Sequence, residues 1–189
     1  MKNFYIILIL FLSFTIYSCA KKSDSSSSSS TTELEGTWQT PCHLPEGSSY
    51  YRIKKLTVTG TNITDTFEYH TDSSCATDYS MWSYTWSSLS IGEEQTYPSY
   101  GSSGGSGHQF TMTIDTNTYT SLSASDVTWN NSNSWCGETD WVLNTAQDVA
   151  GKTCFSTAES PSGHPYYGLY ILDGDKFMPT ASSSSHPDS

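Results

Sequence analysis

The chain has 189 residues, of which 19 are Asp or Glu and 8 are Lys or Arg, so its formal net charge at pH 7 is −11. Nucleic-acid binding needs clustered Lys and Arg to neutralise phosphates, and this chain has one arginine, Arg52. The composition therefore excludes nucleic acid as a partner. Lysines adjoin one another only at Lys21–Lys22, which we interpret as membrane-proximal, and at Lys54–Lys55, which we interpret as solvated strand charges.

An apolar segment opens the chain. Residues 4–17 carry no charge and follow the basic Lys2. A helix needs about 20 apolar residues to cross a bilayer, so this segment is too short to span one. It has the length of a signal-peptide core, and we predict a signal peptide over residues 1–18.

The end of that segment, Ile16-Tyr17-Ser18-Cys19, resembles the lipobox of bacterial lipoproteins. The resemblance implies that the Cys19 thiol carries diacylglycerol and that the peptide bond before it is cleaved. Each buried methylene contributes about 0.8 kcal/mol, so several acyl chains on one cysteine form a firm membrane anchor. Ala20 is not the aspartate associated with inner-membrane retention in such lipoproteins, which favours the outer membrane of the cell envelope. The alternative is that Cys19 is only the tail of a cleaved leader.

Serine-rich segments flank the predicted domain. From Ser23 to Thr32 there is no apolar side chain and one charge, so residues 19–32 are expected to form a flexible tether. About ten such residues hold a domain roughly 17 Å from its anchor on average. Residues 181–189 are predicted to be a disordered tail. Residues 33–180 have the length of one domain.

Within this domain the sequence predicts short strands in succession. Alternation of apolar and polar residues at period two is typical of strands with one buried face. A change of phase at Lys54–Lys55 predicts a bulge in the second strand, and residues 140–151 are predicted to be irregular. In chain order the predicted strands are Gly36–Cys42, Tyr51–Gly60, Asn62–His70 (with Ile63, Phe67 and Tyr69 on one face), the alternations Trp82, Tyr84, Trp86 and Phe110, Met112, Ile114, and finally Tyr167, Leu169, Ile171.

Turn residues separate these strands, at Thr59–Asn62, Tyr100–His108 and Asp173–Lys176. Sequential short strands predict an all-β fold, an antiparallel meander that either closes as a barrel or packs as a sandwich. A closed β-barrel leaves no sheet edge open to aggregation, so we expect closure.

Four cysteines lie in the predicted domain, and an even number in an exported chain indicates disulfides. No two of them have the spacing of two to four residues that is typical of a structural zinc site. In the meander, Cys42 and Cys75 leave strands at the same end, so we predict that they pair and that Cys136 pairs with Cys154. On the loop-entropy model each disulfide contributes roughly 3 kcal/mol.

The segment "LEGTW", Leu34 to Trp38, resembles the opening of a lipocalin-type barrel. That resemblance implies that Gly36 starts the first strand and that Trp38 closes the barrel base. Lipocalins pair this tryptophan with a late arginine, whereas Arg52 lies early in the chain.

Four cysteine-centred motifs are similar, in order and spacing, to the barrel domain of the adenomatosis polyposis coli down-regulated proteins. Those are membrane-attached extracellular proteins with lipocalin-like barrels, implicated in binding lipid-modified signalling proteins. The resemblance implies the barrel and the cysteine framework, but not that eukaryotic partner. The motifs are "GTWQTPC" from Gly36, "YHTDSSC" from Tyr69, "CGETDW" from Cys136 and "DVAGKTC" from Asp148.

No catalytic constellation emerges from the sequence, so we expect a protein without enzymatic activity and without a cofactor or bound metal. "GSSGG" at Gly101–Gly105 matches a nucleophile elbow but lies in a glycine-serine loop rather than between a strand and a helix. The five histidines are dispersed; His70 and Asp72 could form a ligand pair, although a solvated strand end is the simpler interpretation. Glu93 and Glu94 are expected to decorate a loop.

The aromatic stripe Trp82, Tyr84 and Trp86 is the candidate ligand-binding feature. Facing inward, it would fill the core or line an apolar cavity; facing outward, it would suit sugars or a protein partner. We expect a membrane-anchored lipoprotein that binds a hydrophobic small molecule or lipid in a lipocalin-like barrel. The alternative is a surface adhesin or carbohydrate-binding module without a cavity.

Overall fold

We describe the fold from a computed structural model, which describes residues 32–97, 105–173 and 176–182. The predicted signal peptide, Cys19, Lys21–Lys22 and nearly all of the serine tether lie outside these residues. So does most of the Gly101–Gly105 loop. Among the described residues, no helix has the length and apolar character that a membrane span requires.

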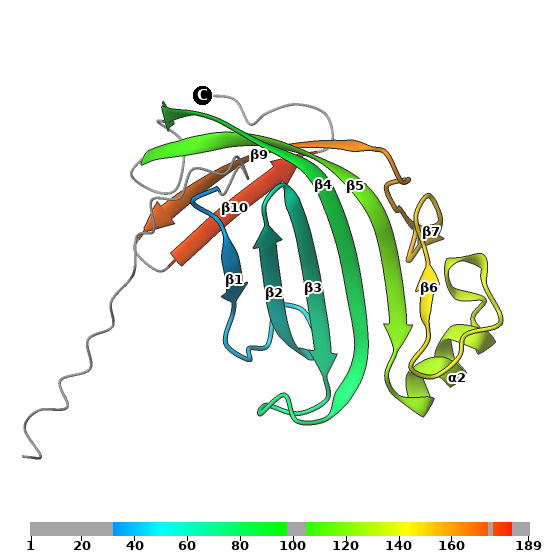
Figure 1. Ribbon diagram of the computed structural model, residues 1–189. Helices are drawn as coiled ribbons and strands as arrows, with labels where there is room; N and C mark the ends of the chain where they lie inside the picture. The colour runs from blue at the N-terminus through cyan, green and yellow to red at the C-terminus, as the bar shows by residue number, and fades with distance from the viewer. Residues whose placement is uncertain (1–31, 98–104, 174–175, 183–189) are drawn as a thin grey trace, which may run out of the picture.

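The main feature of the described chain is a curved antiparallel sheet with the strand order β1-β2-β3-β4-β5-β9-β10 (Figure 1), and β7 (Thr153–Cys154) and β8 (Thr157–Ala158) form a separate two-stranded sheet. β6 also pairs with β5, alongside Thr118–Thr120, whereas β9 pairs with β5 at His108–Thr113. In the view of Figure 1, β9 and β10 run diagonally between the arching upper ends of β4 and β5 and the upper ends of β1 to β3. The strands of this sheet are β1 (Gly36–Gln39), β2 (Tyr51–Thr59), β3 (Asn62–His70), β4 (Asp78–Tyr97), β5 (Gly105–Ser121), β6 (Ala146–Asp148), β9 (Pro165–Asp173) and β10 (Lys176–Ser182).

The prediction of an antiparallel meander is confirmed for β1 to β5, which pair in sequence order. The prediction of a closed barrel is wrong, since within the described ranges β1 and β10 stand at opposite ends of the strand order without pairing. β1 has four residues, and all four pair with β2. The free edge of β1 is therefore short and offers few backbone groups to another strand. β10 also extends to Ser182, two residues into the predicted tail.

The bulge predicted at Lys54–Lys55 is also wrong. β2 and β3 pair without interruption from Tyr51 opposite His70 to Thr59 opposite Asn62. We call the face of the sheet that carries Val58, Ile63, Trp86 and Ile114 the inner face. Side chains alternate between the two faces of a strand, so Arg52 and Lys54 share the inner face with Val58. The apolar pattern therefore changes phase in the sequence because two cations occupy inner-face positions, not because the strand has an extra residue.

The main core lies on the inner face toward β9. Its fully buried members include Ile114, Val58 and Tyr170, and Leu34 reaches it from before β1. The predicted face of Phe110, Met112 and Ile114 packs here, with Phe110 and Ile114 buried and Met112 partly buried. This packing fills one end of the inner face.

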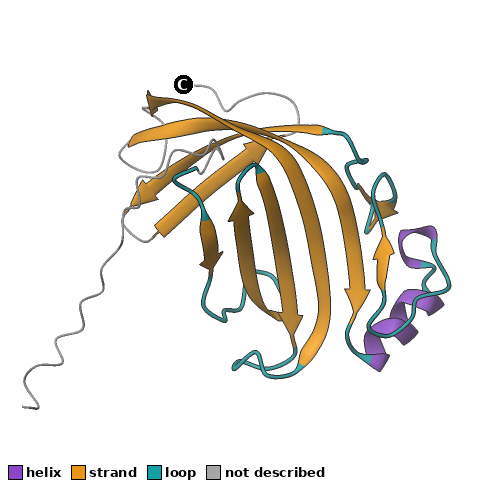
Figure 2. Cartoon of the chain, in the orientation of Figure 1, coloured by secondary structure: helices purple, strands orange, loops and turns teal. Residues whose placement is uncertain are grey.

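A helical unit that follows β5 packs at the other end, where it lies beside β5 and β6 (Figure 2). It consists of α2 (Ala124–Ser132), the short 3-10 helix η1 (Trp135–Gly137) and the hairpin of β7 (Thr153–Cys154) and β8 (Thr157–Ala158). The sequence did not predict α2. The segment predicted to be irregular, 140–151, contains no helix and only the three-residue strand β6.

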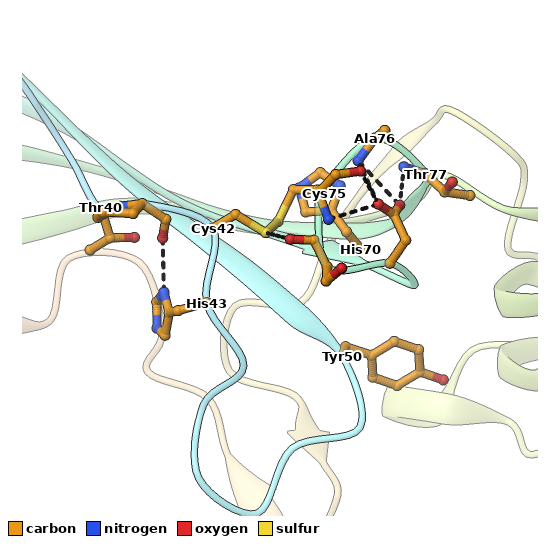
Figure 3. The surroundings of a disulfide bond; sticks show 12 residues. Thr40, Cys42, His43, Tyr50, His70, Cys75, Ala76 and Thr77 are labelled. Atoms are coloured by element: carbon orange, nitrogen blue, oxygen red, sulfur yellow. Dashed lines mark hydrogen bonds between the residues drawn. A yellow bond between two sulfur atoms is a disulfide. The ribbon is translucent and has the colours of Figure 1, made fainter.

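Both predicted disulfides are confirmed. Cys42 bonds to Cys75 and ties the segment after β1 to the turn between β3 and β4, with Tyr50 beside it (Figure 3). Cys136 bonds to Cys154 and ties η1 to β7. Each disulfide therefore fixes one flank of the same end of the inner face.

Candidate functional site

A pocket of about 510 Å³ opens at the end of the inner face that the main core leaves unfilled. Seven of its ten lining residues are aromatic, and they come from β3, β4, β5, α2, the β7–β8 turn and the residue before β2. The lining residues are Tyr50, Tyr69, Tyr79, Ser80, Trp82, Tyr119, Asp126, Trp129, Asn130 and Phe155.

The predicted stripe of Trp82, Tyr84 and Trp86 runs along the inner face. Its rings form a stacked series, with centroids 6.2 Å apart between Trp82 and Tyr84 and 5.9 Å apart between Tyr84 and Trp86. Trp86 is buried in the main core, whereas Trp82 lines the pocket. The stripe thus contributes to the core at one end and to the wall of the pocket at the other.

A second aromatic cluster forms the back of the pocket. Trp135 is buried and meets Tyr119 edge to face at 4.3 Å and Trp82 at 5.7 Å between ring centroids. Trp141 is buried behind them, 5.1 Å from Trp135. Because edge-to-face pairs favour a fixed ring orientation, this cluster holds the Trp82 and Tyr119 walls of the pocket in place.

Asp126 forms the polar floor of the pocket and is 2% exposed. The Tyr119 hydroxyl donates to both of its carboxylate oxygens, at 3.1 and 3.0 Å. Asn130 Nδ2 donates to Asp126 Oδ2 at 3.2 Å and to Ser121 Oγ at 3.0 Å. These bonds join β5 to α2 across the floor.

Burial dominates the electrostatics of this floor. It raises the pKa of Asp126, and hydrogen bonds from Ser121, Tyr119 and other neighbours oppose the rise. Burial also raises the pKa of Tyr119 and of Tyr79, with the Asp126 carboxylate adding to both shifts. The tyrosines are therefore hydroxyl donors at neutral pH.

Local sequence explains how α2 places Asp126. The Ser123 side chain caps the helix by accepting from the Asp126 backbone N–H at 3.2 Å. Asp126 thus stands in the first turn, where a carboxylate complements the helix dipole. Ser-x-x-Asp is a recognised helix-start signal, so this was the feature of the sequence that could have revealed α2.

The mouth of the pocket is framed by two exposed aromatic residues. Trp129 on α2 is 43% exposed and Phe155 in the β7–β8 turn is 69% exposed, with ring centroids 5.7 Å apart. Phe155 and Ser156 have φ of 48° and 68°, as a type I′ turn requires. Asn-Gly is the usual sequence for such a turn, so an exposed Phe here is costly for folding alone, and costs of this kind concentrate at functional sites.

Between the pocket and the main core, the inner face carries charges. Lys54 Nζ lies 3.4 Å from Asp65 Oδ2 and 4.9 Å from the centroid of the Phe67 ring, and the Arg52 guanidinium carbon lies 5.4 Å from that centroid. Burial raises the pKa of Asp65, and the Lys54 ammonium opposes the rise. Arg52 and Lys54 are thus inner-face groups, and only Lys55 matches the prediction of a solvated strand lysine.

Other predicted site residues lie away from the pocket. Gly36 has a φ of 125°, a conformation that favours glycine, and Trp38 on β1 donates from Nε1 to the Leu34 carbonyl at 3.0 Å. His70 is buried rather than solvated, with Nδ1 3.2 Å from Asp78 Oδ1 but without hydrogen-bond geometry. Asp72 does not pair with it.

The other acidic residues singled out in the sequence, Asp72, Glu93 and Glu94, do not line the pocket. Asp72 accepts from the backbone N–H groups of Ser74 and Thr77 and so organises the turn after β3. Glu93 and Glu94 are exposed residues of β4, not of a loop. Within the described ranges, no group of three His, Cys, Asp or Glu side chains is placed to hold a metal ion.

A search against models of protein families found no matching family, and a search of curated proteins found no significant relative.

Proposed function

We propose that this protein is a membrane-anchored bacterial lipoprotein whose domain binds a hydrophobic small molecule or lipid in the aromatic pocket. The observation that carries the proposal is the convergence of seven aromatic side chains on one cavity of about 510 Å³. Pockets for small molecules are typically 300 to 1,000 Å³, mostly apolar, with a few polar groups that orient the ligand. The Asp126 and Asn130 floor supplies such groups.

The direction of the aromatic stripe favours binding of a small molecule over adhesion. Inward aromatics beside an unfilled cavity are what a carrier needs, whereas an adhesin presents its rings on the outside of a filled domain. Trp86 fills one end of the inner face while Trp82 borders the cavity at the other. The lipocalin-like character of the proposal rests on this inward-facing meander and on the resemblance of the Leu34–Trp38 segment.

The proposed location rests on the lipobox-like segment ending at Cys19. Lipidation there would hold the domain at the cell envelope, with the outer membrane favoured by Ala20. The proposed role is non-enzymatic, and the domain would act by holding its ligand near the membrane. Replacing Cys19 with Ser should move the protein from the membrane fraction to the soluble fraction; a variant that still sediments with membranes would refute the anchor.

Carbohydrate binding is the second candidate, because Trp129 and Phe155 are exposed at the mouth of the pocket. Exposed rings of this kind stack on the apolar faces of sugars and anchor interfaces. A glycan would use these two rings from outside, whereas a hydrophobic ligand would enter the pocket and reach Trp82.

Titration with the neutral fluorescent probe N-phenyl-1-naphthylamine tests the first candidate. We expect saturable binding by wild type, weakened at least several-fold by Phe155→Ala and by Trp129→Ala. Leu44→Ala is the matched control, since Leu44 is an exposed apolar side chain outside the pocket. Failure of wild type to bind the probe, or equal losses in the control, would refute the proposed function.

A further inference from the structure

Asp126 is a buried carboxylate without a cationic partner in the described part of the chain. The hydrogen bonds to its oxygens come from neutral donors, which are the hydroxyls of Tyr119, Tyr79 and Ser121 and the Asn130 amide. The ion pairs among the described residues involve other acids, at Lys54–Asp65, His70–Asp78, His108–Glu33 and Lys152–Glu138.

Burial of an ionised carboxylate is unfavourable unless an opposite charge accompanies it. The N-terminus of α2 supplies only a partial positive charge, of about half an elementary charge. Asp126 also lines the pocket, so a ligand in the pocket can place a positive charge beside its carboxylate.

The rings around Asp126 are suited to the same charge. The faces of aromatic rings carry negative partial charge, and Trp and Tyr bind quaternary ammonium groups in cages. Tyr50 and Tyr79 stack at 4.1 Å between centroids on one side of the pocket, and Trp82 and Trp129 come from other elements. The pocket therefore combines a negative floor with π-electron walls.

We infer that the pocket binds an organic cation, with a quaternary ammonium group above Asp126 and against the faces of the surrounding rings. This inference deepens the proposed function and rests on it, since it names the polar end of the hydrophobic ligand. A fatty-acid carboxylate would face repulsion from Asp126.

The pair of choline and 3,3-dimethyl-1-butanol provides the test, because the two molecules have nearly the same shape and only choline is charged. Binding is followed by tryptophan fluorescence at constant ionic strength. We expect wild type to prefer choline by about tenfold, as desolvated cation–π contacts and a carboxylate together allow. Dihexanoyl phosphatidylcholine, compared with choline, shows whether the cation comes from a lipid headgroup or a free small molecule; tighter binding of the lipid indicates the headgroup.

Two variants separate charge from shape. Asp126→Asn keeps an acceptor for Tyr119 and Asn130 but removes the charge, so the preference for choline should vanish while N-phenyl-1-naphthylamine still binds. Trp129→Leu, at an exposed position, keeps apolar surface but removes a ring, so choline binding should weaken more than probe binding. It also serves as the test if the Asp126 variant does not fold.

The outcomes distinguish the inference from the proposed function. Equal binding of choline and its neutral isostere by wild type overturns the cation inference, and the proposed function stands if the naphthylamine probe binds. An unchanged choline preference in a folded Asp126→Asn protein also overturns the inference. Binding of neither probe nor choline removes the proposed function itself.

Discussion

The Phe155 turn gives a prediction in which stability and binding separate. Phe155 has a φ of 48° and is 69% exposed, so its side chain buries roughly a third of its surface, mainly against Trp129 and Trp135. An aromatic side chain exposes about 200 Å², and at about 25 cal/mol per Å² a third of that area corresponds to about 1.5 kcal/mol. Phe155→Ala should therefore lower the free energy of unfolding by about 1.5 kcal/mol.

Phe155→Gly removes the same ring but also removes the strain of a left-handed conformation, which costs roughly 1 kcal/mol for a residue with a Cβ. Phe155→Gly should thus be about 1 kcal/mol more stable than Phe155→Ala, although glycine destabilises most other positions. Both variants should lose pocket affinity equally, because both lack the ring.

Urea unfolding followed by tryptophan fluorescence measures the stability difference, and probe titration measures affinity on the same samples. The reasoning about this turn is refuted if Phe155→Ala is as stable as Phe155→Gly or more stable. It is also refuted as an argument about function if either variant binds the probe as wild type does.

Three further perturbations test other parts of the structure. Replacing Cys136 and Cys154 together with Ala should lower the free energy of unfolding by roughly 3 kcal/mol in urea, and an unchanged midpoint would contradict this. Burial raises the pKa of Asp126, so the folded protein holds a proton that the unfolded chain releases; the resulting stability is complete below pH 3.8 and is lost as pH rises through the folded pKa. Asp126→Asn should therefore gain stability relative to wild type as pH rises above 3.8, and parallel pH curves in thermal unfolding would count against it. Lys54→Met leaves Asp65 without its ion pair and should cost about 1 kcal/mol, most of which the double variant Lys54→Met/Asp65→Leu recovers; a double-mutant cycle without coupling would show that the pair contributes nothing.

Local patterns predicted the strands well because one face of each is buried. The alternation of apolar and polar residues predicted a strand at Asn62–His70, which are the bounds of β3, and it assigned Trp82, Tyr84 and Trp86 to a common face. The order of the strands then predicted the Cys42–Cys75 disulfide, since successive antiparallel strands bring alternate turns to the same end of a sheet, and Cys136–Cys154 followed as the remaining pair.

Features that depend on tertiary geometry were not predicted. Barrel closure depends on the pairing of two distant edges, about which no strand carries local information. The inward Lys54 resembled an interruption because its partners, Asp65 and Phe67, lie on the next strand. A polar residue can be assigned to a buried face only when the residue that compensates its charge or hydrogen bonds is known.

The candidate site was predicted only through Trp82. Tyr69 and Trp82 belong to recognised strands, but Asp126 lies on a helix whose polar sequence has no apolar stripe. Phe155 lies in a turn whose sequence is atypical for its conformation. A pocket assembled from such segments has no contiguous motif, although the Ser123 cap signal marked where its floor begins.

Native mass spectrometry of the protein, extracted gently from its own host, tests the central claim most directly. We predict that wild type carries one small hydrophobic molecule as a mass excess and that the double variant Trp129→Ala/Phe155→Ala does not. A folded wild-type protein that is free of ligand and binds glycans through the same two rings would contradict the claim.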